Sequence, residues 1–192
     1  MTLDLALFLK ALASPALMSG GAVALVLSVI VFVLSFFGCL PVALCLNSAK
    51  RGRRLTAQVY VWVFRAAPLI LVLLIVWNGA PQAGPALLKA HWFTPFVAAA
   101  ISLTLVSVAY MGEIMKGALR SIAKEQGEAA QALGLRPFQT FRLVILPQAL
   151  RVALPPFVNE FINILKVTSL AYVISLREIM AVVNDAIAAS FR

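Results

Sequence analysis

The feature of this sequence that most limits its fold is an uncharged stretch near the N-terminus. No Asp, Glu, Lys or Arg occurs from residue 11 to residue 49, and residues 22–46 are predominantly apolar. A helix of about 20 such residues crosses a hydrocarbon core about 30 Å thick. A signal peptide would have an apolar region of only about 7–15 residues, ending at a small-residue cleavage site. We therefore predict that residues 22–46 form a spanning helix.

Three further stretches are long and apolar enough to cross a membrane. The second span is expected at residues 55–78, interrupted by Arg65 and bent or broken near Pro68, because proline removes a backbone hydrogen bond and clashes with the preceding turn. The third is expected from residue 95 to residue 112 or beyond. The fourth, residues 143–165, contains charged residues and prolines. The sequence thus predicts an all-α membrane protein.

The composition agrees with a membrane protein and excludes other classes. Of the 192 residues, 62% are hydrophobic and 12% are charged, whereas a soluble globular domain has about 45–50% apolar and about 25% charged residues. This composition excludes an ordinary soluble domain, a disordered segment and a nucleic-acid-binding domain. The formal net charge is +9. In a membrane protein the positions of the Lys and Arg residues along the chain are more informative than this sum, because they indicate the orientation in the membrane.

The positive charges alternate between loops. Residues 48–54 carry four of them and residues 79–94 carry only Lys89, whereas residues 115–142 carry five. Because Lys and Arg accumulate on the cytoplasmic side, we expect the N-terminus outside and the loops around residues 51 and 130 inside. We divide the chain into an external or interfacial segment, 1–19, and a transmembrane domain, 20–192.

Residues with chemical reactivity are few and scattered. Cys39 and Cys45 lie six positions apart in one apolar run, without CxxC spacing, and are interpreted as buried helix residues. His91 stands alone beside Trp92 and is interpreted as interfacial. The sequence contains no catalytic triad, metal-spaced cluster or carboxylate pair on one helix face. We expect no catalytic site, metal, cofactor or nucleic-acid partner.

The long loop between the third and fourth predicted spans has helix-forming and helix-ending signals of its own. Residues 128–133 are expected to form a short helix with small side chains, ending at Gly134 in the left-handed conformation. Pro137 suits the first turn of a second helix. The loop is therefore predicted to be a two-helix elbow. The side chains available to pack it are Leu133, Leu135, Phe138 and Phe141.

The elbow resembles a known motif. Glu128, Ala129 and Ala130 are followed after three residues by Gly134, and after nine more by Val144, Ile145, Leu146 and Pro147. This pattern resembles the EAA loop of ABC importer permeases (EAA, x3, G, x9, I, x, L, P), with Val144 in place of isoleucine. The stretches 109–114, 146–151 and 154–169 resemble the polar-amino-acid branch of that family.

The resemblance implies a fold, a mechanism and partners. The fold would be a type I ABC importer permease bundle, and residues of about 116–147 would form the loop that couples it to a cytoplasmic ATPase subunit. A second permease chain, identical or homologous, and a periplasmic or surface-tethered binding protein would complete the importer in a bacterial inner membrane. The chain has no GxxxxGK[ST] loop, so ATP hydrolysis would belong to a separate subunit.

The chain departs from the family pattern at three places. Arg65, Ala66, Ala67 and Pro68 stand where relatives have Arg-Gly-Thr-Pro, and Val167 replaces the acid of a Lys-Asp-Thr-Ser sequence. Relatives also continue into one more span. We therefore expect four of five spanning helices here, with truncation as the preferred explanation.

The resemblance and the intramembrane charges together suggest a substrate path near mid-membrane. Glu160, Asn163 and Val167 share a helix face, and a charged side chain facing lipid is costly. Arg65 either snorkels to the interface or faces a cavity. Alternatively, Glu160 simply pairs with Arg151 or Lys166. The residues assigned to the path are Glu160, Asn163, Lys166, Val167, Thr168, Ser169 and Arg65.

Three functions remain in competition on the sequence alone. The leading one is the permease subunit of an ATP-driven importer of polar amino acids. A stand-alone secondary carrier or channel would use the same intramembrane charges without an ATPase, but such carriers are usually built from larger repeats. A membrane-embedded enzyme is disfavoured because the sequence contains no catalytic set.

Overall fold

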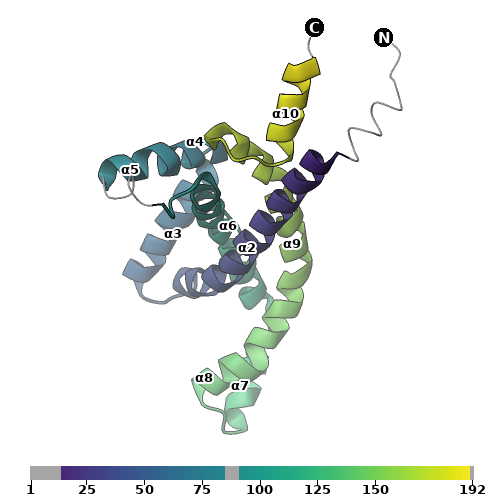
Figure 1. Cartoon of the computed structure of the whole chain (residues 1–192). Coiled ribbons are helices and arrows are strands. Elements are labelled where there is room, and N and C mark those ends of the chain that lie inside the picture. Colours follow the sequence, from purple (N-terminus) through teal and green to yellow (C-terminus); the bar gives the residue numbers. More distant parts are fainter. Residues whose placement is uncertain (1–13, 85–90, 191–192) are drawn as a thin grey trace. The chain divides into compact units, whose positions relative to one another are not determined.

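The computed structural model of the chain describes residues 14–84 and 91–190, and within them every regular element is a helix. Figure 1 labels the main elements. Their order along the chain is α2 (Pro15–Leu46), α3 (Arg51–Ala66), α4 (Leu69–Leu74), η1 (Ile75–Gly79), α5 (Ala80–Ala83), α6 (Pro95–Ser121), α7 (Lys124–Ala132), α8 (Pro137–Thr140), η3 (Phe141–Ile145), α9 (Leu146–Val167), η4 (Thr168–Ile174) and α10 (Ile179–Ser190).

The predicted spans are found as helices. Three helical runs are long and apolar enough to cross a membrane, namely α2, α6 and the run Pro137–Ile174. The helices on either side of Pro68 make a fourth if they are counted together. The all-α prediction and its four spans therefore agree with the structure. Three parts of the predicted organisation lie outside the described residues: residues 1–13 of the N-terminal segment, Lys89 with its neighbours, and the last two residues.

The break near Pro68 is confirmed. Helix α3 ends at Ala66 and α4 begins at Leu69, with Pro68 at φ −58° and ψ 129° between them. The value of ψ is far from helical, as expected where the pyrrolidine ring excludes the backbone hydrogen bond and disfavours helix at the preceding residue. The second predicted span is therefore interrupted at Ala67 and Pro68, which lie between the two helices.

The described chain forms two compact units. The first comprises the described parts of Met1–Phe32, Ala67–Thr104 and Asn163–Arg192, and the second comprises Val33–Ala66 and Leu105–Ile162. The long helices α2, α6 and α9 each contribute residues to both units.

The first unit has an apolar core formed by segments that are distant in sequence. Its buried members are Leu27, Val31, Leu73, Ala98, Ala99, Leu103, Ile164, Ala171, Ile174 and Leu176. Near its C-terminal end, the buried Glu178 caps α10, because its Oε1 accepts a hydrogen bond from the Ala181 N–H at 3.1 Å. Gly20 permits close packing there, since a Cβ at Gly20 would lie 3.0 Å from the Glu178 backbone.

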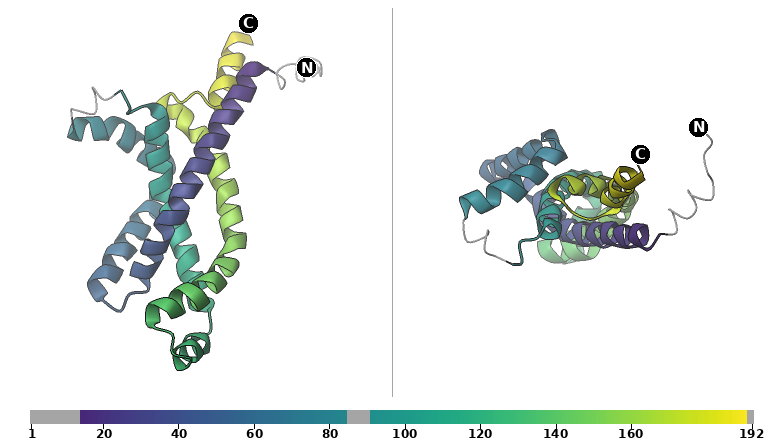
Figure 2. Two further views of the ribbon diagram at one scale, coloured as in Figure 1. Left: turned by 60° about the horizontal axis from the view of Figure 1, so that its bottom comes forward. Right: turned by 45° about the horizontal axis from the view of Figure 1, so that its top comes forward.

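The second unit depends on close contact between α2 and α6. A Cβ on Gly38 would lie 2.7 Å from Val108, and one on Gly112 would lie 2.8 Å from Val42. Small residues let two helix backbones approach in this way. Helix α3 joins the pair through the Tyr60 hydroxyl, which donates to the Leu105 carbonyl at 2.7 Å. The left view of Figure 2 shows α3 following the end of α2 in a hairpin.

The two cysteines occupy helix positions, as predicted. Cys39 is buried, Cys45 is half-buried, and both are free thiols. The Cys39 thiol donates to the Phe36 carbonyl at 3.1 Å within α2, so it acts as a small helix residue.

Candidate functional site

The elbow predicted from the sequence is present, and its turn is a well-defined helix ending. Gly134 has φ +87°. Its N–H donates to the Gln131 carbonyl at 2.9 Å, and the Leu135 N–H donates to the Ala130 carbonyl at 3.2 Å. This pair of hydrogen bonds defines a Schellman motif, with glycine at the residue that must be left-handed. The prediction for Gly134 is therefore confirmed.

The second helix of the elbow continues into the last long span. Pro137 is its first residue, and the Arg136 N–H donates to Gln139 Oε1 at 2.9 Å just before it. The residues that follow remain helical through η3 and α9 to Ile174, and Leu146 and Pro147 are the first two residues of α9. Figure 2 shows α7 and α8 side by side at the start of this run.

The outer side of α7 is polar and small. Glu128 is exposed, and its Oε1 lies 3.1 Å from Lys124 Nζ. Ala129 is also exposed, whereas Ala130 is buried. A cleft of about 340 Å³ runs beside α7 and is lined in part by Leu119, Gly127, Glu128, Gln131 and Ile145.

The prediction that four apolar residues pack the elbow is wrong for two of them. Leu133 is 85% exposed and Phe138 is 70% exposed, whereas Leu135 and Phe141 are half-buried. The elbow has only two short helices, which enclose too little volume to bury four large side chains. Two large apolar residues therefore remain on its surface.

The residues assigned to the substrate path are divided between the two units. Arg65 and Glu160 belong to the second unit, and the others belong to the first. Glu160 is 9% exposed, whereas Asn163 and Lys166 are exposed. Thr168 is buried and its hydroxyl donates to the Leu165 carbonyl, while the Ser169 hydroxyl donates to the Lys166 carbonyl, both at 2.8 Å. Val167 is half-buried at the end of α9, where the chain tightens into η4.

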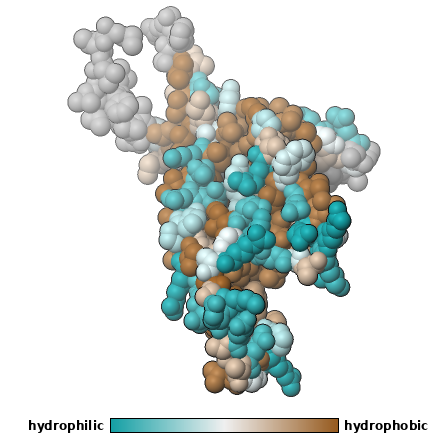
Figure 3. All heavy atoms as spheres, turned by 180° about the vertical axis from the view of Figure 1, so that it is seen from behind, coloured by the Kyte–Doolittle hydropathy of each residue, from teal (hydrophilic) through white to brown (hydrophobic). Residues whose placement is uncertain are grey.

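A groove with charged side chains in its wall, which the sequence interpretation did not identify, lies between α3 and α6 in the second unit. Its volume is about 710 Å³, and its wall includes Gln58, Trp62, Arg65, Tyr110, Glu113 and Lys116. The Arg65 guanidinium carbon lies 5.0 Å from the centre of the Tyr110 ring. Figure 3 shows hydrophilic side chains among hydrophobic ones on the face opposite to that of Figure 1.

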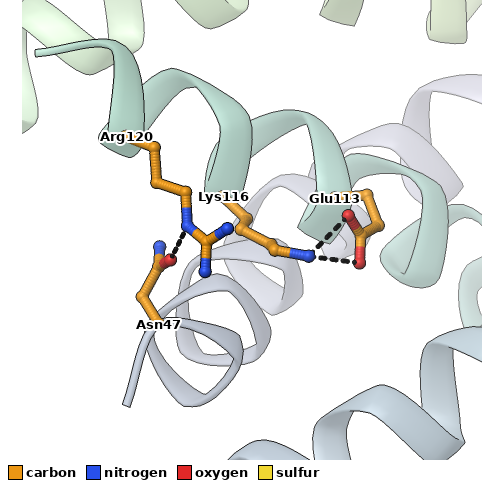
Figure 4. Close-up of polar contacts among 4 residues, drawn as sticks. All are labelled: Asn47, Glu113, Lys116 and Arg120. Carbon is orange, nitrogen blue, oxygen red and sulfur yellow. Dashed lines mark hydrogen bonds and ion pairs between the residues drawn. The ribbon is translucent and has the colours of Figure 1, made fainter. Parts of the chain in front are cut away.

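Polar contacts continue along α6 towards its C-terminal end (Figure 4). Lys116 Nζ lies 3.1 Å and 3.0 Å from the two carboxylate oxygens of Glu113. One turn further on, Arg120 Nε donates to Asn47 Oδ1 at 2.7 Å, just after the end of α2. The Glu–Lys spacing of three could have been found from the sequence, whereas the Arg65–Tyr110 contact joins residues on different helices and has no local pattern.

The described residues contain no group of three or more His, Cys, Asp or Glu side chains that could hold a metal ion. Several helices able to span a membrane, with an elbow that continues into one of them, define a multi-span membrane protein. Residues 39–189 match the family described as the binding-protein-dependent transport system inner membrane component. The match covers more than half of the chain, so the chain belongs to that family.

Curated relatives agree with this membership. A probable amino-acid ABC transporter permease of Vibrio harveyi is 41% identical over 71% of this chain and 60% of its own length. A probable amino-acid permease of Bacillus subtilis is 34% identical over 88% of this chain and 74% of its own length. The histidine/lysine/arginine/ornithine transport system permease of Salmonella typhimurium is 33% identical over 81% and 68%. The chain thus spans about 60–74% of the length of these proteins.

The fold is also that of a solved transporter. A chain in the crystal structure of an amino acid ABC transporter with histidines superposes with a TM-score of 0.84 at 30% identity, covering all of this chain and 86% of that chain. The all-α permease bundle implied by the EAA resemblance is therefore confirmed. The similarities favour a permease subunit over the stand-alone carrier.

Proposed function

We propose that this chain is the transmembrane permease subunit of an ATP-driven importer that translocates polar amino acids delivered by an extracytoplasmic binding protein. In this arrangement the protein is a multi-pass component of a bacterial inner membrane, with its N-terminus outside. The distribution of Lys and Arg supports that orientation, since residues 48–54 carry four positive charges and residues 79–94 carry one.

The observation that carries the proposal is the geometry of the elbow. Glu128, Ala129 and Ala130 lie on α7, a Schellman turn at Gly134 reverses the chain, and the second helix runs on into α9. A short helix with small, exposed side chains suits docking against another protein, and the continuous helix links the docking surface to a spanning segment. The elbow is therefore assigned the coupling role, with Gly134 at its turn and Leu146 and Pro147 where it joins α9.

The energy source is assigned to a partner. The chain has no GxxxxGK[ST] phosphate-binding loop, so ATP is hydrolysed by a separate cytoplasmic subunit that docks on α7. A second permease chain, identical or homologous, completes the translocation path. The chain itself is not an enzyme.

Polar amino acids are the proposed cargo, because the relatives are described as permeases for amino acids, including histidine, lysine, arginine and ornithine. Glu160 would attract the amino or cationic group of the substrate. Lys166 and the Thr168 and Ser169 hydroxyls would contact its carboxylate, near Asn163 and Val167. The alternative role for Glu160 is to hold the helices together through an ion pair.

Reconstitution tests this function. The chain is expressed with its cognate ATPase and binding protein, and the complex purified in mild detergent is placed in lipid vesicles. We expect the ATPase to co-purify, and radiolabelled arginine, histidine or glutamine to be taken up only with ATP and loaded binding protein. Uptake by the permease chain without an ATPase would establish the stand-alone carrier instead.

A further inference from the structure

The α3–α6 groove places opposite charges and aromatic rings in a part of the chain that crosses the membrane. Arg65 follows Arg54 by eleven residues, which is about 16 Å along a helix, so it lies well inside the bilayer if the basic residues at the start of α3 mark the surface. Charged groups at that depth seldom face lipid, because hydrocarbon does not solvate them. The groove therefore requires water, a partner or a ligand.

The charges of the groove do not balance. Glu113 is paired with Lys116, and the two side chains are only 28% and 20% exposed. The Arg65 guanidinium lies over the Tyr110 ring, and within the described residues it is in no ion pair. The Tyr110 ring attracts the Arg65 cation from one side, but it accepts no hydrogen bond from the guanidinium N–H groups. The groove consequently has a net positive charge and an open guanidinium.

A guanidinium with free N–H donors binds carboxylates in a bidentate manner. Because Arg65 lines the same groove as Glu113, a ligand with a carboxylate and an ammonium group a short distance apart would match both. The groove volume of about 710 Å³ is within the range of small-molecule sites. Trp62 and Tyr110 add apolar surface for the rest of such a molecule.

We infer that the α3–α6 groove is a binding site for a free α-amino acid, in which Arg65 binds the carboxylate and Glu113 faces the ammonium group. This inference rests on the proposed import function and adds to it a site separate from the α9 residues. When the ligand binds, the Glu113–Lys116 ion pair opens so that Glu113 can face the ligand's ammonium group. Lys116 stays beside the Glu113 carboxylate.

Cysteine protection tests the site in the assembled transporter. In a background with Cys39→Ala and Cys45→Ala, Gln58→Cys is exposed to a small anionic methanethiosulfonate in phosphatidylcholine vesicles. We expect modification at position 58, which lines the groove, and none at Val63→Cys, which lies outside it on the same helix. No modification at position 58 would mean that lipid or a second chain fills the groove, and would overturn the inference.

The ligand probes are free arginine, histidine and glutamine, each compared with its α-carboxamide, which lacks the carboxylate. At least one free amino acid should slow the modification, whereas its amide should not. Arg65→Gln should raise the concentration for half-protection about tenfold or more, and Arg65→Lys by less, because lysine keeps the charge but loses the planar fork. Arg53→Gln, the same charge change at an exposed position of α3 outside the groove, is the matched control and should have no effect.

Two results separate this inference from its alternatives. If protection by all three amino acids equals protection by their amides, or persists unchanged in Arg65→Gln, the site is not a carboxylate site. If modification is slowed by phosphatidylethanolamine in the vesicles and by no amino acid, the groove holds lipid headgroups. ATP-driven amino-acid uptake is measured in the same vesicles. If uptake occurs but no amino acid protects position 58, the groove site is wrong and the import function stands. If an amino acid protects position 58 but no uptake occurs, the import function is wrong and the groove site stands.

Discussion

Gly134 and Ser175 occupy the same position in two helix endings of the same type. Gly134 has φ +87° after α7, and Ser175 has φ 65° after η4. In both places the left-handed residue and its successor donate to the carbonyls three and four positions before the left-handed residue, since Ser175 N–H bonds the Tyr172 carbonyl and Leu176 N–H bonds the Ala171 carbonyl. Glycine adopts the left-handed conformation without a Cβ penalty, whereas serine adopts it at a cost in free energy.

The first prediction concerns Gly134. No atom lies within 4 Å of a Cβ placed there, so Gly134→Ala adds only conformational cost and should lower the free energy of unfolding by about 1 kcal/mol. The control is Gly117→Ala, at an equally open position inside α6, which should be neutral or stabilising by up to about 1 kcal/mol. Thermal unfolding in detergent measures both, and an equal response of the two variants would contradict the assigned left-handed turn.

The second prediction is the converse substitution, Ser175→Gly. Removing the Cβ at a left-handed residue should stabilise the protein by about 1 kcal/mol. The Ser175 side chain is exposed, so the substitution creates no cavity. A lower midpoint of thermal unfolding than in the unchanged protein would show that the serine hydroxyl supports the turn.

Sequence reasoning at this scale succeeded where a residue type has one strong conformational preference. Gly134 and Pro68 were placed correctly because glycine and proline restrict the backbone in known ways. Ser175 gave no signal, since serine is common in every turn type. The exposed Leu133 and Phe138 were mispredicted because apolarity alone does not say whether a large enough core is available.

At the scale of helices, the α2–α6 contact is closer than apolar patterning alone implies. Helix α2 is apolar on all sides, so hydrophobicity did not indicate which face meets α6. The structure identifies it through Gly38 and Gly112, where an added Cβ would lie under 3.0 Å from a valine side chain. Glycines inside spanning helices were the usable sequence signal, because they mark close helix packing in membranes.

The third prediction is a double-mutant cycle at this contact. Gly112→Ala should destabilise the protein by about 1–3 kcal/mol, because its Cβ would lie 2.8 Å from Val42 Cγ1. Val42→Ala removes that atom, so the double variant should recover most of the loss. Additive effects in thermal unfolding would mean that the two residues do not meet.

The fourth prediction concerns coupling through α7. Glu128→Arg reverses a charge on the proposed docking surface, so ATP-driven uptake should fall about tenfold or more if docking loses about 1.4 kcal/mol. Lys124→Ala is the control, because it removes the exposed Lys124–Glu128 ion pair, which contributes little to stability, and leaves the motif intact. Normal uptake per ATP hydrolysed by the Glu128→Arg complex would remove α7 from the coupling path.

At the scale of the whole chain, the number and order of the spans followed from hydropathy. The division into two compact units did not, because their boundaries cut through α2, α6 and α9 at positions without any composition change. The α3–α6 groove was missed for a related reason. Its residues come from sequence segments about 45 positions apart, and only the fold brings Arg65 to Tyr110.

The fifth prediction tests the orientation in the membrane. Single cysteines, Ser48→Cys and Gln82→Cys, are placed in a background lacking Cys39 and Cys45. An impermeant thiol reagent added to intact cells should label position 82 and leave position 48 unlabelled until the membrane is opened, because the four positive charges at residues 48–54 favour the cytoplasm. The reverse pattern would invert the topology and place the elbow outside.

The uninterrupted run Pro137–Ile174 gives the elbow a mechanical property that a loop would not have. A flexible tether absorbs displacement at one end by changing its own conformation. A helix is stiffer than a loop because backbone hydrogen bonds join its successive turns, so a push on the elbow displaces the adjoining first turns of α9. The π turn at Phe141–Ile145 lies between the elbow and α9, and single π turns of this kind are frequent at functional sites. Force applied at the elbow would therefore reach the start of α9 as movement of a helix.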